Sequence, residues 1–226
     1  MNPFIPIVLV ICISLSGSES AGLAGKSLIF PTKTNTSFVK LKTPTFSKLS
    51  AFTVCFWAAS EVVRPYALFS YSTSRSQFEL LIWQDINGMF YLYLGDYGAK
   101  FSLPKANGLL RHICVTWESQ GGVGAAWING RRSLQKVGGK GQTVKGSGEI
   151  ILGQTKDRRH GTYDINGCFV GEISDVNMWD HVLNSNQIKM LSQNCLCTGG
   201  NIIDWNTIGY TAAGNVKIQD SKRCQF

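Results

Sequence analysis

Short stretches in which apolar and polar residues alternate make up much of this 226-residue chain. The clearest is at residues 112–119, where isoleucine, valine and tryptophan alternate with polar or small residues that include Cys114. Period-two alternation is typical of a strand that turns one set of side chains toward a core. The run at residues 52–57 alternates in the same way and contains Cys55, a compatible disulfide partner.

Turn residues separate many such runs. Three Asn-Gly dipeptides, at Asn87, Asn129 and Asn166, predict hairpins or tight turns because both residue types tolerate positive φ. Many short strands with regular turns indicate a single all-β domain built as a two-sheet sandwich. One helix is expected at residues 183–191, after a capping Asn or Ser. Strands are predicted at residues 27–30, 38–41, 52–58, 66–71, 78–83, 89–94, 112–118, 123–128, 150–152 and 169–179.

The N-terminus has a different pattern. Residues 5–15 form an apolar run of the length of a signal-peptide core, too short to span a bilayer, and small residues follow at 18–20. We therefore expect residues 1–20 to be removed on export. This leaves a domain at residues 21–219 and a tail at residues 220–226, and no later segment is apolar enough to span a membrane.

The charge is basic, with a net value of +8 that becomes +9 when Glu19 leaves with the signal, since 22 basic then face 13 acidic residues. A basic exported protein attracts acidic partners such as sulfated glycans or phosphorylated surfaces, although the charge also serves solubility. No cluster of basic residues is interleaved with aromatic ones, so a dedicated nucleic-acid surface is not expected.

Six cysteines remain after export, an even number that favours disulfides over metal binding. They are Cys55, Cys114, Cys168, Cys195, Cys197 and Cys224. The spacing alone allows fifteen connectivities, and bridges within one chain and between subunits both stay open.

Residues 112–119 read His-x-Cys-x-Thr-Trp-x-Ser, which resembles the signature octapeptide of the pentraxins at every fixed position. Residues 171–180, residues 151–154 upstream and residues 201–205 after the expected helix also resemble this family, so the resemblance covers roughly residues 26–219. It implies a flattened jelly-roll β-sandwich, a Cys55–Cys114 disulfide and assembly into a ring, usually of five subunits. It further implies a secreted innate-defence protein that binds phosphorylated, carbohydrate or anionic surface ligands.

Motifs for catalysis are lacking. The chain contains neither Gly-x-Ser-x-Gly nor His-Glu-x-x-His. His112 is expected to be packed beside the disulfide and His160 to lie in a basic loop. His181 is expected either to cap the helix start or to be solvated there. A Ser-His-Asp triad stays open, because its members need meet only in space. We expect a binding protein and not an enzyme.

The resemblance also implies a calcium site with ligands from two segments. Ca²⁺ requires six to eight oxygen ligands. The family's Asp-Asn pair falls at Gln77 and Phe78, and phenylalanine has no side-chain oxygen. In the second segment the candidate metal ligands are Asp157, Asp164 and the backbone carbonyl of Lys156.

Two acids therefore remain where the family has four. The other two positions of the second segment are Thr155 and Gly167. Lys156, Arg158 and Arg159 add three positive charges that repel a divalent cation, so calcium should bind weakly or not at all. Asp164 would then form only an Asx-type turn.

This basic loop suggests an alternative mode of recognition. Lys156, Arg158 and Arg159 are candidate ligand-binding residues that would grip an anion directly, with weak sites multiplied around a ring. A solvated basic turn explains the same pattern, and a structural or storage oligomer without a ligand site is a third possibility.

Two further sites concern modification and disulfides. Asn35 begins the single N-glycosylation sequon, Asn35-Thr36-Ser37, in a polar stretch between strands. Cys168 directly follows the candidate loop, and a disulfide there would either pin that loop or bridge the edge of the sandwich. Four tryptophans are expected in the core and not as ligand platforms. They are Trp117, Trp127, Trp179 and Trp205.

Overall fold

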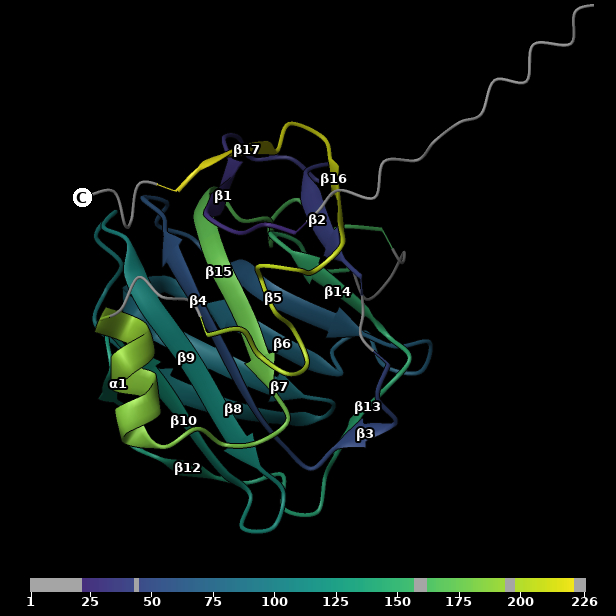
Figure 1. Ribbon diagram of the computed structural model, residues 1–226, viewed down its shortest axis with the longest axis vertical. Helices are drawn as coiled ribbons and strands as arrows, with labels where there is room; N and C mark the ends of the chain where they lie inside the picture. Colours follow the sequence, from purple (N-terminus) through teal and green to yellow (C-terminus); the bar gives the residue numbers. More distant parts are fainter. Residues whose placement is uncertain (1–21, 43–44, 157–161, 194–197, 222–226) are drawn as a thin grey trace, which may run out of the picture.

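The computed structural model describes residues 22–42, 45–156, 162–193 and 198–221. Over these residues the chain forms two large antiparallel sheets that face each other, a small two-stranded sheet and one α-helix (Figure 1). The predicted all-β sandwich with one short helix is confirmed.

The first sheet, called sheet A, contains the predicted Cys55 and Cys114 strands at its centre. Its order is β11 (Arg131–Arg132), β10 (Val123–Ile128), β9 (Arg111–Glu118), β4 (Ala51–Ala59), β15 (Gly171–Trp179), β1 (Lys26–Phe30) and β17 (Lys217–Asp220), and β12 (Lys136–Val137) also pairs with β10. Its two edges are therefore the β11–β12 segment and β17.

The second sheet, called sheet B, faces sheet A across the core. Its order is β16 (Tyr210–Ala213), β2 (Phe38–Leu41), β14 (Glu149–Leu152), β5 (Tyr66–Ser72), β6 (Leu80–Gln84), β7 (Met89–Leu94) and β8 (Tyr97–Ser102). A 3₁₀ turn, η1 (Ile86–Gly88), joins β6 to β7, and β3 (Lys48–Leu49) pairs with β13 (Val144–Lys145) beside the main sheets.

Aromatic and aliphatic side chains from both sheets fill the space between them. On β9 the alternation works as predicted: Ile113, Val115 and Trp117 belong to this core, and each fully buried large side chain contributes roughly 1.5–3 kcal/mol. All four tryptophans expected in the core are buried, which confirms that prediction.

The other face of β9 is also covered, which the sequence pattern did not indicate. Helix α1 (Ser185–Gln193) packs its buried Ile188 into a second apolar cluster that contains both cysteines of the disulfide. The Cys55–Cys114 bond, implied by the resemblance, joins directly paired residues of β4 and β9. The side chain of Asn184 caps α1 by accepting hydrogen bonds from the backbone N–H groups of Asn186 and Gln187.

Two of the Asn-Gly turns adopt the strained geometry that this dipeptide permits. Asn87 and Asn129 have φ values of 56° and 49°, and a glycine at positive φ follows each. Asn166 forms a turn without positive φ. The strands missed from the sequence are short or lie at the end of a sheet, and include β8, β16 and β17.

The described part of the chain contains no helix with the length and hydrophobicity needed to cross a bilayer. The expected signal segment, residues 1–20, lies outside the described residues.

Candidate functional site: the outer face of sheet B

One row of cross-strand partners runs across sheet B on the side away from the core. It consists of Lys40, Ile151, Ser70, Leu81 and Tyr93. Directly paired residues share a face, and their sequence neighbours on each strand belong to the core cluster. The row therefore marks the outer face of sheet B, on which Glu149 and Trp83 also lie by the period of two.

The segment that follows β14 turns back to this face. Lys156 pairs with Tyr163 in an isolated bridge, so residues 156 and 163 lie opposite each other. The Nζ atom of Lys156 is 3.3 Å from Oε2 of Glu149, whose Oε1 lies 2.6 Å from Nζ of Lys40. The hydrogen bond from Lys40, followed by that from Lys156, holds the pKa of Glu149 below its ordinary value. One carboxylate is thus shared by two ammonium groups.

Asp164 forms the Asx-type turn that the sequence predicted. Its Oδ1 accepts the backbone N–H of Asn166 at 2.9 Å, and its carbonyl accepts that of Gly167 at 3.1 Å. Lys33 donates to Oδ1 of Asn166 at 3.3 Å, so a further ammonium group lies beside this turn. Lys156, another of the predicted site residues, contacts Glu149 as described above. Asp157, Arg158, Arg159 and His160 lie outside the described residues.

An aromatic group that the sequence reasoning missed adjoins this segment. A side chain on Gly167 would meet the Trp83 ring at 3.1 Å, so tryptophan and turn are in close contact. Trp83 pairs with Tyr91, whose ring stacks on that of Tyr93 with centroids 5.7 Å apart. Lys100 places Nζ 5.9 Å from the centre of the Tyr91 ring. The alternation of Tyr91 and Tyr93 with the buried residues of β7 could have indicated this aromatic group from the sequence.

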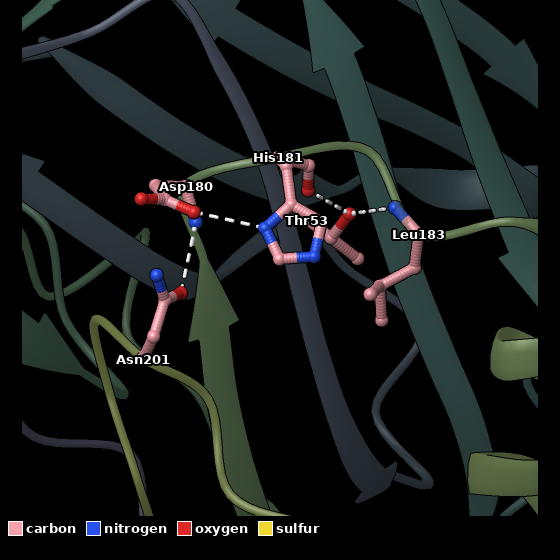
Figure 2. Close-up of polar contacts among 5 residues, drawn as sticks. All are labelled: Thr53, Asp180, His181, Leu183 and Asn201. Carbon is pink, nitrogen blue, oxygen red and sulfur yellow. Dashed lines mark hydrogen bonds and ion pairs between the residues drawn. The ribbon is translucent and has the colours of Figure 1, made fainter.

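Figure 2 shows a second polar group, at the end of β15 on sheet A. Nδ1 of His181 lies 2.8 Å from Oδ1 of Asp180, and this contact lowers the pKa of Asp180. The Thr53 hydroxyl donates to the carbonyl of His181 and accepts the backbone N–H of Leu183. Because that hydroxyl bonds backbone groups, the described residues here assemble an Asp-His pair and not a nucleophilic triad.

His112 is packed as expected. It is buried, its ring lies 5.2 Å from that of Trp57, and its nitrogens are 3.7 and 3.8 Å from Sγ of Cys114. Cys55, Cys114 and His112 bring their ligand atoms within 4.8 Å of one another, but the disulfide uses both sulfurs. A thiolate metal site is thereby ruled out in the oxidised protein.

Both interpretations of Cys168 as a disulfide partner are wrong. Its thiol is buried and unpaired, and NH2 of Arg64 donates to its Sγ at 3.4 Å. The same guanidinium donates to the Cys168 carbonyl at 2.6 Å, so Arg64 holds this backbone directly. Cys195, Cys197 and Cys224 lie outside the described residues. Asn35 is exposed at a bend, and its glycosylation stays a prediction.

Comparison with known proteins decides the family. The model of the Pentaxin family matches residues 26–220. A C-reactive protein of Danio rerio is 40% identical over 221 residues, covering 94% of this chain and 98% of that protein. Serum amyloid P-component of Homo sapiens is 36% identical over 219 residues, covering 97% and 98%. The chain belongs to the pentraxin family. Its relatives are recognition proteins and not enzymes.

The pentraxin fold also agrees with a solved structure. A heptameric SAP-like pentraxin from Limulus polyphemus superposes with a TM-score of 0.82 at 22% identity, covering 92% of this chain and all of that one. At this identity the similarity supports the fold alone.

The calcium expected of a pentraxin can be tested against the donors present. Thr155 is buried with an unpartnered hydroxyl, and Lys156 presents an ammonium group held by Glu149. Of the candidate calcium ligands that the structure describes, only Asp164 offers a carboxylate, because Asp157 lies outside the described residues. That carboxylate already accepts a backbone hydrogen bond. Among the described positions the donor set does not fit a hard cation that prefers several carboxylates. The positions compared are Gln77, Phe78, Thr155, Lys156, Asp164 and Gly167.

Proposed function

We propose that this pentraxin is a secreted pattern-recognition protein that binds anionic groups on surfaces through the outer face of sheet B, without calcium. The observation that carries the proposal is the placement of Lys156. Its ammonium group, together with that of Lys40, surrounds the single carboxylate of Glu149 where a calcium site would need more acids. Two ammonium groups around one carboxylate leave an excess of positive charge, which can attract an anionic ligand.

The sequence extends this charge. Arg158 and Arg159 follow Lys156 closely, and guanidinium groups form bidentate hydrogen bonds with phosphate, sulfate and carboxylate. The neighbouring rings of Trp83, Tyr91 and Tyr93 supply contact area for the uncharged part of a glycan or lipid headgroup. Exposed charge pairs are screened by salt, so each single site is weak and sensitive to ionic strength.

Weak sites become effective in an oligomer, and we propose a ring of five subunits. Leu134, which is 81% exposed, and Val137, which is 76% exposed, lie on the β11–β12 edge of sheet A. Ile218 is exposed on β17, the opposite edge of the same sheet. Apolar side chains on two opposite edges suit a head-to-tail contact, which closes into a ring when the rotation permits. Identical sites around such a ring gain through avidity.

The ring contact can be tested with a matched pair of variants. Leu134→Glu should lower the mass measured by light scattering toward that of one chain, because a buried unpaired carboxylate opposes the contact. Val63→Glu is the control, since Val63 is 88% exposed on the β4–β5 connection and away from both edges. An unchanged mass for Leu134→Glu would contradict the assigned edge.

The binding mode can be tested by retention of the mature protein on a phosphate- or sulfate-bearing resin. We expect elution by salt and not by a calcium chelator. Arg158→Glu combined with Arg159→Glu should abolish retention. Lys105→Glu combined with Lys189→Glu changes the net charge equally at exposed positions, Lys189 being on α1 beyond sheet A, and should retain most binding. Elution by chelator would establish the calcium-dependent alternative, and no retention would establish an oligomer without an anion site.

A further inference from the structure

A cavity of about 430 Å³ opens at one end of the sandwich, where the β5–β6 and β7–β8 connections meet the chain around β13. Its floor includes the buried side chains of Trp117 and Val144. Gly95 and Gly141 are on its wall at positive φ, and no atom lies within 4 Å of where a Cβ would be on either. The mouth of the cavity is therefore open to small molecules.

Four charged residues line this cavity, two acidic and two basic. They are Arg75, Glu79, Asp96 and Lys145. Within the described chain none of them takes part in an ion pair, since the pairs found join Lys26 to Asp220, Lys40 and Lys156 to Glu149, and His181 to Asp180. The cavity is therefore lined by acidic and basic side chains that form no ion pair with one another.

Glu79 is the most constrained of the four. It is only 6% exposed, and its Oε1 accepts the backbone N–H of Lys145 at 2.6 Å. A buried carboxylate is costly unless a cation or several hydrogen bonds compensate it. Gln142, which also lines the cavity, has a buried Oε1 without a hydrogen-bond partner. Because the only hydrogen bond found to the Glu79 carboxylate among the described residues is the one from Lys145, this edge of the cavity favours a ligand that donates hydrogen bonds.

We propose that this cavity binds a small zwitterion with one ammonium and one carboxylate group, such as a free amino acid or a short peptide. The ammonium group is held by Glu79 and Asp96, and the carboxylate by the guanidinium fork of Arg75. The volume lies within the range of small-molecule sites, and the apolar floor receives the aliphatic part of the ligand. The residues that line this cavity do not include Lys40, Glu149 or Lys156, on which the proposed anion binding rests.

The test uses three probes on the full mature chain in saturation-transfer NMR and calorimetry. Glycylglycine carries both charges, glycinamide only the ammonium group and N-acetylglycine only the carboxylate. We expect glycylglycine to bind at least tenfold more tightly than either single-charge probe. Asp96→Asn and Glu79→Gln should each weaken the binding of glycinamide about tenfold and leave the binding of N-acetylglycine unchanged. Arg75→Gln should weaken the binding of N-acetylglycine about tenfold and leave that of glycinamide unchanged.

Two controls separate recognition from damage to the fold. Asp96 is exposed at the β7–β8 turn, so Asp96→Asn reports on binding even if Glu79→Gln unfolds the chain around β13. Glu61→Gln makes the same charge change at an exposed position outside the cavity and should alter no probe. The proposal is overturned if no probe binds, if the three bind equally, or if Glu61→Gln matches Asp96→Asn.

Discussion

Polar residues are buried in the β4–β9 strand pair but only partly buried in the connection from β14 to β15. In the strand pair, every residue of β9 except Glu118 is buried, and the disulfide joins directly opposed cysteines. In the connection, Lys156 and Asp164 are only half-buried and contact other polar side chains or turn backbone. Both segments lie within the residues that the pentraxin family model matches.

The difference shows which physical constraint acts on each segment. Residues packed on both sides can change little without leaving a cavity or an unpaired polar group. Residues on an exposed connection need only complete a turn, so their charges are free to determine what binds. The fold can therefore tolerate changes of charge in such a connection.

The strand pair should be the more sensitive to truncation. Trp117→Ala is expected to lower the free energy of unfolding by about 3–5 kcal/mol, because it empties a fully buried site. Trp83→Ala, on the outer face of sheet B, should cost about half as much or less but reduce resin binding. Denaturant titration of both variants measures the difference. Equal destabilisation would contradict the contrast between the two regions.

Removal of the disulfide should have the next largest effect. Replacing both Cys55 and Cys114 by alanine releases a constraint between residues 59 apart in sequence and should cost about 2–4 kcal/mol. Cys168→Ala removes a buried but unpaired thiol and should cost about 1 kcal/mol. Thermal unfolding in non-reducing buffer compares the two, and the account fails here if Cys168→Ala is the more harmful.

The smallest effect concerns the Glu149 ion pairs in the connection. The folded-state pKa of Glu149 is lowered, so its contribution to stability is present above the unfolded pKa of about 4.3 and is lost as the pH falls through the folded value. The group is partly exposed, so this contribution is about 0–1 kcal/mol. Glu149→Gln should be less stable than the parent chain at pH 6 and equal to it near pH 3. A stability difference that is constant with pH would contradict the pairing.

The strand pattern was predictable because the apolar side chains that face the core between the sheets recur with a period of two, as on β7 and β9. The cover of α1 over the far side of β9 was not, because it depends on packing between segments distant in sequence. The turn at Asp164 was predictable from the local Asp-x-Asn-Gly pattern. The contacts of Lys156 with Glu149 and of Gly167 with Trp83 arise from the path of the chain over sheet B, which no local pattern encodes.

Calorimetric titration of the mature protein with calcium tests the central claim most directly. We expect no saturable heat up to about 1 mM calcium, the weak end of the range for extracellular calcium modules. We also expect anion binding to be unchanged by chelator. Saturable binding of two ions per chain well below that concentration would contradict the claim that this pentraxin recognises its ligands without calcium.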